Sequence, residues 1–323
     1  MNTKELRPLV SGLFARSRSR TTRVAVEQEL LVADAATGAA VPIERVRHAA
    51  RTAAAAQYLG FEPGGQLELS LPCAPDLATL TRTLGTLTDD LRRHLAAADI
   101  RTQALPVDPR TEDQVPLQLT SPRYVAMQRH FDTIGPAGRR MMRRTASTQV
   151  CLDWWPGRDG AEQWRVLNLA GPFLAAAFAR SSGPDGRLTT WLDVDPARTG
   201  FDDRLLHGDN PVAAYTSFAA GATVFTTGGP AEHLTTLFPP VRPRGNYLEV
   251  RFLDVQEPVA AGYIVAVLAS LLYDDEIRRR TLRALEPNRP HLAEHWRAAA
   301  AGDIPTAVRG RELVPVRDLE LVA

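Results

Sequence analysis

Acidic and amide side chains recur at alternate positions in four short apolar runs of this chain. Glu27 and Glu29 lie two residues apart in VAVEQELLVAD, and Glu68 lies in GQLELSL. Gln149 in TQVCLD and Glu249 in YLEVRFLDV follow the same alternation. Residues two apart in a β-strand share a face. We therefore expect four strands that each carry carboxylate or amide oxygens on one face and aliphatic side chains on the other.

Such polar faces can simply meet water, as antiparallel sheets commonly allow, and for any single strand this remains the alternative. Glutamate is a poor strand former, however, and like charges on neighbouring strands repel one another. Cations between the strands would explain the collection of acids. Oxygen ligands suit Mg²⁺ or Mn²⁺, whereas zinc prefers histidine or cysteine. The predicted metal ligands are Glu27, Glu29, Glu68, Glu249 and, through its amide oxygen, Gln149.

Composition narrows the classes of function. The 323 residues carry a formal net charge of +1, with 44% hydrophobic and 23% charged side chains. Such a balance is typical of a globular protein and gives no field to attract nucleic acid or an anionic membrane. Lys4 is the only lysine and lies in no glycine-rich loop, which argues against a Walker-type phosphate loop. If the protein uses ATP, metal ions and arginines must hold the triphosphate.

The order of the expected elements favours an α+β fold, with helices packed outside a mainly antiparallel sheet. We expect one catalytic domain over residues 1–323, with residues 1–22 peripheral or poorly ordered. No signal peptide or run of about 20 apolar residues is present, so a cytoplasmic location is expected. Helices are expected at 45–57, 76–95, 122–131, 166–179, 259–272 and 275–285, strands at 24–34, 65–71, 145–153 and 247–255, and mostly loops at 181–236.

Longer blocks of the sequence resemble glutamate–cysteine ligases of the plant and actinobacterial type, including the ergothioneine-pathway branch. These blocks lie between Val24 and Glu276: VEQELL, GGQLELS, YVAMQRHFDTIGPAGRRMMRRTASTQVCLD, RTGF, HLTTLFPPVRPRGNYLEVRFLD and LLYDDE. The resemblance implies a glutamine-synthetase-like catalytic fold of the carboxylate–amine ligases, in which an antiparallel sheet holds ATP and metals. It also implies the first committed step of thiol biosynthesis.

Position by position, Glu27 and Glu29 match the paired acids of the family, Glu68 the acid of its G-G-Q-x-E-L block and Glu249 that of its L-E-x-R block. The resemblance places the substrate or ATP contacts at Arg144, Thr145, Gln149, Arg187, Trp191, Arg198, Thr199 and Arg251.

Guanidinium groups bind carboxylates as a bidentate fork, so Arg144 and Arg187 are expected at the substrate α-carboxylate. Surface ion pairs are the alternative for both arginines. Arg251 would contact phosphate or pair with Glu249. Arg198 would bind an anion or fix the R-T-G turn.

The expected reaction is the ATP-dependent ligation of the glutamate γ-carboxylate to the amine of cysteine, through a γ-glutamyl phosphate. Only TTGGPAE separates Phe225 from His233, where the family usually has a longer insertion. The same chemistry with another amine acceptor, in a specialised pathway, is therefore an alternative. The partners expected are small-molecule substrates, with no nucleic acid and no membrane, and the sequence does not indicate an oligomeric state.

Two interpretations from other classes of protein are alternatives to a ligase. HLAEH, from His291 to His295, fits the H-x-x-E-H pattern of inverted zinc peptidases, although no third ligand is evident. A binding or regulatory homologue that has lost turnover is the other alternative. The clustered acids argue against it, because uncompensated carboxylates would only destabilise the fold.

Overall fold

A seven-stranded antiparallel sheet forms the centre of the computed structural model, which describes residues 1–15, 19–208 and 210–313. Its strands follow the order β2-β3-β1-β5-β7-β6, with β4 paired to β1 off this path. The strands are β1 (Val24–Asp34), β2 (Leu59–Phe61), β3 (Leu67–Ser70), β4 (Ile100–Gln103), β5 (Thr148–Asp153), β6 (Val241–Pro243) and β7 (Tyr247–Val250). The α+β prediction with an antiparallel sheet is confirmed.

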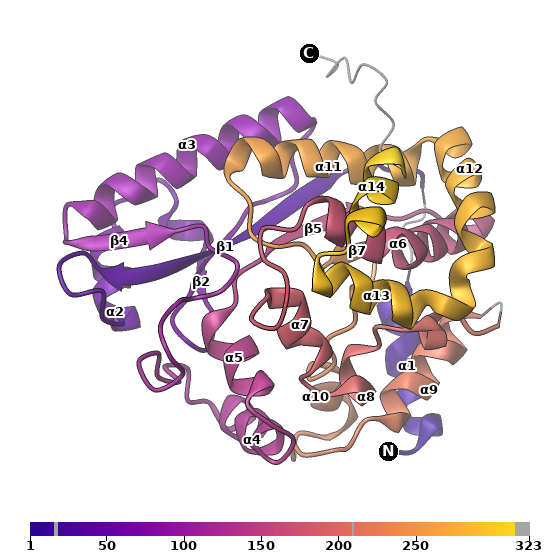
Figure 1. Ribbon diagram of the computed structural model, residues 1–323, viewed down its shortest axis with the longest axis horizontal. Helices are drawn as coiled ribbons and strands as arrows, with labels where there is room; N and C mark the ends of the chain where they lie inside the picture. The colour runs from indigo at the N-terminus through magenta and orange to yellow at the C-terminus, as the bar shows by residue number, and fades with distance from the viewer. Residues whose placement is uncertain (16–18, 209, 314–323) are drawn as a thin grey trace.

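Helices cover both faces of the sheet (Figure 1). They are α1 (Thr3–Leu13), α2 (Ile43–Ala50), α3 (Leu77–Ala96), α4 (Pro122–Asp132), α5 (Ala137–Arg144), α6 (Gly157–Ala177), α7 (Arg187–Leu192), α8 (Pro196–Thr199), α9 (Pro211–Gly221), α10 (Gly229–Leu234), α11 (Pro258–Tyr273), α12 (Asp275–Leu285), α13 (Leu292–Ala301) and α14 (Ile304–Leu313). In Figure 1, α3 and α11 lie above the sheet, and α4, α5, α7 and α10 lie below it.

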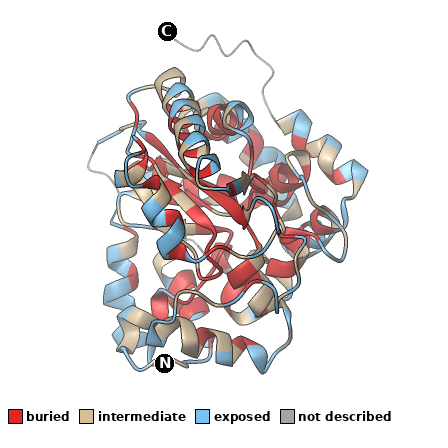
Figure 2. Ribbon diagram, turned by 90° about the vertical axis from the view of Figure 1, so that its left-hand side faces the viewer, coloured by how far each residue is buried: buried red, intermediate tan, exposed pale blue. Residues whose placement is uncertain are grey.

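The strand register sets the polar side chains in rows across the sheet. Glu29 pairs with Glu68 on β3, and Glu27 pairs with Gln149 on β5. One strand further, Cys151 pairs with Glu249 on β7. Paired residues point to the same face, so the acids of separate strands converge. The opposite face carries aliphatic side chains into the core, and buried residues follow the sheet through the middle of the molecule (Figure 2).

Helix α3 shows how the sequence builds the apolar layer. Asp76 caps it by accepting a hydrogen bond of 2.6 Å from the backbone N–H of Thr79, as the sequence predicts. Its buried side chains recur every three or four residues and pack toward the sheet and α11. They are Leu80, Leu84, Leu87, Thr88, Leu91 and Leu95.

Three expected elements differ from the structure. The helix expected at 45–57 is α2, which ends at Ala50 before a series of turns. The strand expected at 247–255 forms sheet pairs only from Tyr247 to Val250. The expected loop region contains α7, α8, α9 and α10. Side-chain caps at Asp195 and Asn210, each followed by proline, begin α8 and α9 and explain why this glycine- and proline-rich segment is helical.

The N-terminal segment is part of the core, contrary to the expectation of a peripheral segment at residues 1–22. Leu6 and Val10 on α1 are completely buried. Phe14 makes edge-to-face contacts with Trp154, Trp164 and Tyr215, with ring centroids 5.2–5.6 Å apart. Aromatic contacts of this kind add stability beyond the burial of area. Residues 16–18 lie outside the described part of the chain.

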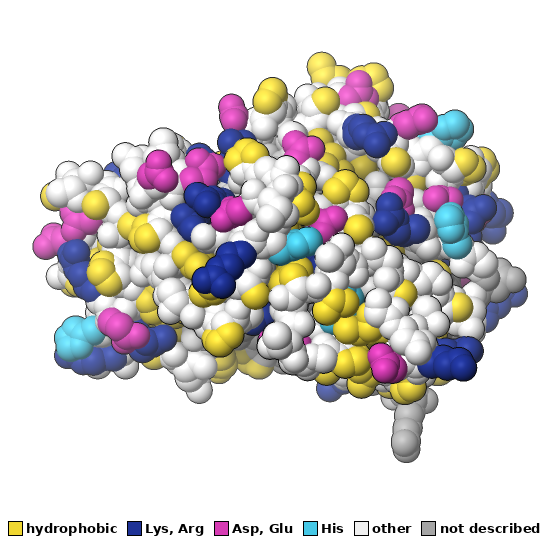
Figure 3. Space-filling model, turned by 90° about the horizontal axis from the view of Figure 1, so that it is seen from below, with side chains coloured by type: hydrophobic (Ala, Val, Ile, Leu, Met, Phe, Trp, Pro, Cys, Tyr) yellow, Lys and Arg dark blue, Asp and Glu magenta, His cyan; other side chains and the backbone are white. Residues whose placement is uncertain are grey.

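Within the described residues, no single helix is long and apolar enough to cross a membrane. One pair of consecutive segments is long and apolar enough only when the two are taken together: Pro258–Tyr273 and Asp275–Ala301. The chain bends by 86° at the break between them. On the face seen in Figure 3, basic and acidic side chains are interspersed.

The turn between β2 and β3 depends on a glycine. A Cβ on Gly64 would lie 2.3 Å from the backbone oxygen of Arg143 at the end of α5. We expect Gly64→Ala to lower the free energy of unfolding by about 1–3 kcal/mol, because neither backbone can move away cheaply. Chemical denaturation measures this. Gly12→Ala on α1 is the control, since its Cβ would meet nothing within 4 Å. Equal stability of the two variants would contradict the close approach.

Candidate active site

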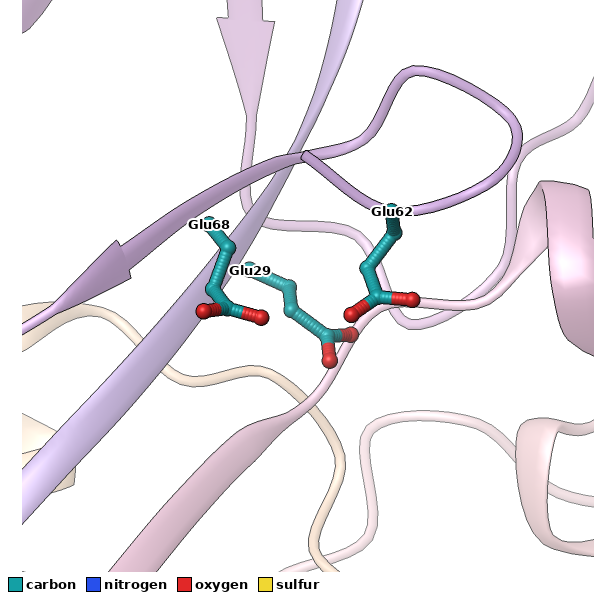
Figure 4. Close-up of side chains that lie close together, drawn as sticks. All are labelled: Glu29, Glu62 and Glu68. Atoms are coloured by element: carbon teal, nitrogen blue, oxygen red, sulfur yellow. The ribbon is translucent and has the colours of Figure 1, made fainter. Parts of the chain in front are cut away.

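Three glutamates form a compact acid cluster on one face of the sheet. Glu29 lies on β1, Glu68 opposite it on β3, and Glu62 in the turn that joins β2 to β3. Each offers a carboxylate oxygen, and these oxygens lie within 4.8 Å of one another. Figure 4 shows the three carboxylates directed toward a common point. Ser70 donates a hydrogen bond of 2.5 Å to Glu68 and holds that side chain in place.

Burial and mutual repulsion raise the pKa values of two carboxyl groups in this cluster. Burial raises the pKa of Glu29, and the charge on Glu68 raises it further, although Arg187 and a hydrogen bond from Ser147 oppose the change. Burial also raises the pKa of Glu62 well above its usual range, with added repulsion from Glu29 and Glu68. A hard divalent cation would relieve both costs, and an all-oxygen donor set fits Mg²⁺ or Mn²⁺.

Glu27 lies beside this cluster on β1, two residues before Glu29. Its pKa is raised to about 7, mainly by burial and then by the charges on Glu249 and Glu68. It lines a second cavity of about 290 Å³, together with Cys151, Asp153 and Tyr247. The structure therefore brings Glu27, Glu29 and Glu68 onto one face, as the sequence predicts, and adds Glu62, which the sequence reasoning missed.

Three arginines surround Glu249, the fourth predicted acid. Glu249 is 1% exposed and accepts hydrogen bonds of 2.7 and 3.0 Å from Arg242. Arg251 Nε lies 2.9 Å from Glu249 Oε1, and Arg244 Nε lies 3.6 Å from Oε2. Burial alone would raise the pKa of Glu249, but these guanidinium groups outweigh it and lower the pKa. Glu249 therefore orients arginines, and its oxygens are already engaged.

Gln149 bridges the acid cluster and the arginines. Its Nε2 donates a hydrogen bond of 2.8 Å to Glu29, and its Oε1 accepts one of 3.1 Å from Arg251. The carboxylate of Glu29 can only accept a hydrogen bond and the guanidinium of Arg251 can only donate one, so the NH₂ group of Gln149 must face Glu29 and its oxygen must face Arg251. The amide presents its NH₂ group to Glu29, and its oxygen points away from the acid cluster. This geometry does not support the prediction that Gln149 binds the metal at that cluster.

A cavity of about 540 Å³ opens between the acid cluster and the arginines. Its wall includes residues of α4, α5, α7 and the segment around α10. The lining residues are Glu29, Glu62, Pro63, Gln66, Arg123, Tyr124, Met127, Met141, Met142, Thr145, Trp191, Glu232, Thr235, Phe238, Arg242, Arg244 and Arg251. The predicted contacts Thr145, Trp191 and Arg251 are thus on its wall. Among the described residues, Trp191 Nε1 and Arg251 Nη1 are buried donors without a partner, so both are available to a ligand.

Three predicted substrate arginines do not line this cavity in the described structure. Arg144 donates to the backbone oxygen of Asp108 at 2.8 and 3.1 Å and to Glu112 at 2.6 Å. Arg187 is 1% exposed and donates to the backbone oxygen of Arg251 at 3.0 Å. Both guanidinium groups donate to backbone oxygens away from the cavity, so this geometry gives no support to the prediction that they bind the substrate α-carboxylate.

Arg198, the third, pairs with Asp195 at 3.1 Å and donates to Thr236 at 2.7 Å. The hydroxyl of Thr199 donates to the backbone oxygen of Asp195. These contacts fix the R-T-G turn, which is one of the two roles that the sequence left open for Arg198.

Sequence reasoning missed Glu62, Arg123, Arg242 and Arg244. The turn signal Pro63-Gly64-Gly65 could have indicated a hairpin in which Glu62 shares a face with Glu68. The backbone N–H of Glu62 does donate to the oxygen of Gln66 at 2.8 Å. No comparable signal distinguishes Arg242 from the many other arginines of the chain.

The described residues give no support to the interpretation of HLAEH as a zinc-binding motif. His291 Nδ1 lies 3.2 Å from Glu294, and the ring of His295 packs at 4.9 Å from that of Phe173. The acid cluster is the one group of potential metal ligands found among the described residues.

Comparisons with known proteins place the chain in a family. Residues 23–319 match the glutamate-cysteine ligase family 2 (GCS2). The chain belongs to this family. It is 32% identical over 283 residues to the glutamate–cysteine ligase EgtA of Mycolicibacterium smegmatis, covering 74% of this chain and 64% of EgtA. It is 28% identical over 269 residues to a chloroplastic glutamate–cysteine ligase of Medicago truncatula, covering 70% of this chain and 52% of the relative.

Among solved structures, a glutamate–cysteine ligase of Francisella tularensis in complex with AMP is similar at 13% identity, with a TM-score of 0.49. The similarity covers 93% of this chain and 83% of that one. The chain spans less than two thirds of the length of the curated relatives named above.

Metal binding tests the acid cluster directly. We expect Glu62→Gln to weaken Mn²⁺ binding by about tenfold or more, because it removes one charged oxygen donor from the set. Electron paramagnetic resonance of free Mn²⁺ measures this without any substrate. Glu232→Gln is the control, since Glu232 lines the same cavity outside the cluster. Equal Mn²⁺ affinity in wild type and Glu62→Gln would exclude Glu62 as a ligand.

The raised pKa of Glu27 predicts how stability depends on pH. Its pKa is about 7 in the folded chain against a usual 4.5, so the folded state binds the extra proton between these values. In the presence of EDTA, the melting temperature should therefore fall as pH rises from about 5 to about 8. Glu29 and Glu62 contribute in the same direction. Glu27→Gln should flatten the slope, and an unchanged slope in that variant would contradict the assignment.

Proposed function

We propose that this chain catalyses the ATP-dependent ligation of the glutamate γ-carboxylate to the amine of cysteine. The observation that carries the proposal is the partly buried acid cluster facing arginines across one cavity, in a chain of the glutamate–cysteine ligase family. A ligase needs both elements, because divalent cations and the anionic groups of ATP and glutamate must meet in one place.

The reaction has two steps. The γ-carboxylate oxygen of glutamate attacks the γ-phosphorus of ATP, and the bond to the bridging oxygen of ADP breaks. The amine nitrogen of the second substrate then attacks the acyl carbon, phosphate leaves, and the nitrogen loses a proton. The protein provides positioning and charge neutralisation in both steps. Magnesium, when bound, supplies positive charge that offsets the phosphates.

Roles for individual residues follow from their positions. Glu29, Glu62 and Glu68 would hold a divalent cation, and Glu27 would hold a second one beside them. Arg251, with one donor unpaired, would receive an anionic oxygen of substrate or nucleotide. Glu249 and Gln149 would keep Arg251 in that orientation. A metal role for Glu249 has less support, because its oxygens already accept hydrogen bonds from guanidinium groups.

For the identity of the amine acceptor, a specific feature of the chain favours an alternative to cysteine. Helix α10 and the short segment before it lie where the sequence resemblance implies a longer insertion, and Glu232 of α10 lines the cavity. The same chemistry with another amine is therefore the second candidate. The similarity to EgtA enzymes supports a place in thiol biosynthesis, including the ergothioneine branch, and a cytoplasmic enzyme acting on small molecules.

The test is a coupled assay of phosphate release with ATP, Mg²⁺ and glutamate, over a panel of amines. Wild type should release phosphate in a glutamate-dependent manner and form the γ-glutamyl amide of cysteine. Glu27→Ala and Glu29→Ala should each lower kcat by about a hundredfold or more, since charge stabilisation at the reacting phosphate is lost. Glu44→Ala, at an exposed residue of α2, is the control. Full activity in either variant would overturn the assignment, provided that both melt cooperatively.

A further inference from the structure

A second cavity, of about 730 Å³, lies apart from the one that adjoins the acid cluster. It is bounded by the loop before α7, by α7 and α8, and by α13, which neighbour one another (Figure 1). We call it the α7–α13 cavity. Among the described residues, none that lines it also lines the catalytic cavity. Trp191 and Leu192 are adjacent on α7 but line different cavities, so this helix separates the two.

The wall of the α7–α13 cavity is mainly apolar. Its apolar side chains include Pro184, Leu192, Pro196, Phe201, Ala293 and Ala300. Phe201 is 8% exposed and lies edge-on to Trp296, with ring centroids 4.9 Å apart. Trp296 cannot retreat toward α6, because a Cβ on Gly171 would lie only 2.7 Å from its ring. Phe201 is therefore held in place, and such a wall favours a ligand with an apolar body.

The threonines of this wall are already engaged. Thr189 donates its hydroxyl to the backbone oxygen of Gly183 at 2.6 Å, and Thr199 donates to that of Asp195 at 3.2 Å. Neither hydroxyl hydrogen is therefore directed at a ligand. The polar recognition that the cavity offers comes from its charged side chains.

Two of these charged side chains have opposite sign and no partner. Asp193, Asp202 and Arg297 line the cavity. Asp202 accepts hydrogen bonds of 2.8 Å from Arg204 and is thereby neutralised. In the part of the chain that the structure describes, neither the carboxylate of Asp193 nor the guanidinium of Arg297 takes part in an ion pair or a side-chain hydrogen bond. A cavity with one unpaired carboxylate and one unpaired guanidinium complements a ligand that carries both charges.

The packing of the helices directs both charges at the cavity. Thr189 Oγ1 lies 3.5 Å from the backbone oxygen of Ala300, which sets α7 beside α13. Asp193 follows Thr189 by four residues, and Arg297 precedes Ala300 by three. Residues three or four apart share a helix face, so each charge lies on the side of its helix that turns toward the other helix. No ion pair joins the two charges, and a ligand can therefore lie between them.

We propose that the α7–α13 cavity binds an α-amino acid with a large apolar side chain, at a site separate from the substrates. Its carboxylate pairs with Arg297, its ammonium group pairs with Asp193, and its side chain packs against Leu192 and Phe201. The volume is within the range of about 300–1,000 Å³ that is usual for small-molecule sites. An amino acid with a hydroxyl side chain would lose hydrogen bonds to water on this wall. Binding requires no ATP, so the inference holds whether or not the chain is a ligase.

Ligand analogues and variants remove the same contacts from the two sides. Fluorine NMR of 4-fluoro-L-phenylalanine measures binding to the full chain, without ATP or metal. Phenethylamine lacks the carboxylate, 3-phenylpropionate lacks the ammonium group, and L-serine lacks the apolar body; each is titrated as a competitor. Arg297→Gln and Asp193→Asn remove the two charges, and Ala293→Trp fills the cavity. Glu294→Gln is the control, at an exposed residue of α13 outside the cavity.

Wild type should bind 4-fluoro-L-phenylalanine, and each competitor should bind at least about tenfold more weakly than it, because each lacks one set of contacts. Arg297→Gln should weaken binding of 4-fluoro-L-phenylalanine about tenfold and leave phenethylamine unchanged, since that analogue has no carboxylate to lose. Asp193→Asn should also weaken it about tenfold and leave 3-phenylpropionate unchanged. Glu294→Gln should match wild type, and Ala293→Trp should abolish binding while melting cooperatively.

Excess L-glutamate should not displace 4-fluoro-L-phenylalanine, because the catalytic cavity is a separate one. Three results would each overturn the inference: no binding to wild type, displacement by glutamate, or unchanged affinity in both charge variants. Loss of phosphate release in the ligase assay would leave these binding results as they are, so failure of the proposed function is distinguished from failure of this site.

Discussion

The close packing of three partly buried carboxyl groups in the acid cluster is the constraint on which the rest of the site depends. Glu29 and Glu62 are held in a poorly solvated place next to Glu68, where ionised carboxylates repel one another. Nothing in the packing of an apolar core would require such an arrangement, because three hydrophobic side chains would be less costly there. The cost becomes useful when a divalent cation is present, since the same burial that raises the pKa values strengthens the attraction for the metal.

The contacts that position the acid cluster extend beyond the sheet to the loop before α7. Ser147 donates its backbone N–H to Glu29 at 2.7 Å and forms an isolated bridge with Asp254. Asp254 accepts hydrogen bonds of 2.8 Å from the backbone N–H groups of Arg180 and Ser181. The hydroxyl of Ser181 then accepts from the backbone N–H of Arg187, where α7 begins. Glu29 and the helix that carries Trp191 are therefore joined by a chain of polar contacts.

Alternation along the strands was sufficient to predict the acid face, because the period of two is a property of the backbone. The register of Glu29 with Glu68 and of Glu27 with Gln149 then brings the predicted side chains together. Helices with strong caps and regular apolar spacing, such as α3, were also predictable. Short helices between residues 181 and 236 were not, since their stability comes from packing and from single caps.

Arginines were the least predictable part of the site, and the reason is physical. A guanidinium can bind a backbone carbonyl as well as a carboxylate, and sequence does not show which partner is near. Arg144 and Arg187 hold backbone oxygens, whereas Arg242 faces the cavity from a three-residue strand with little sequence pattern. Pairing of Arg242 with Glu249 follows from the β6–β7 hairpin, which only the folded chain reveals.

The order of charges across the sheet makes the two halves of the site dependent on each other. Carboxylates lie at one side, Gln149 in the middle and arginines at the other, and the amide can satisfy both neighbours in one orientation only. A cation held by the acid cluster would compete with Gln149 for an oxygen of Glu29. One side chain, Gln149, thus contacts both Glu29 and Arg251. An arrangement of this kind would link the position of a bound cation to the orientation of Arg251, because both depend on the one orientation of the Gln149 amide.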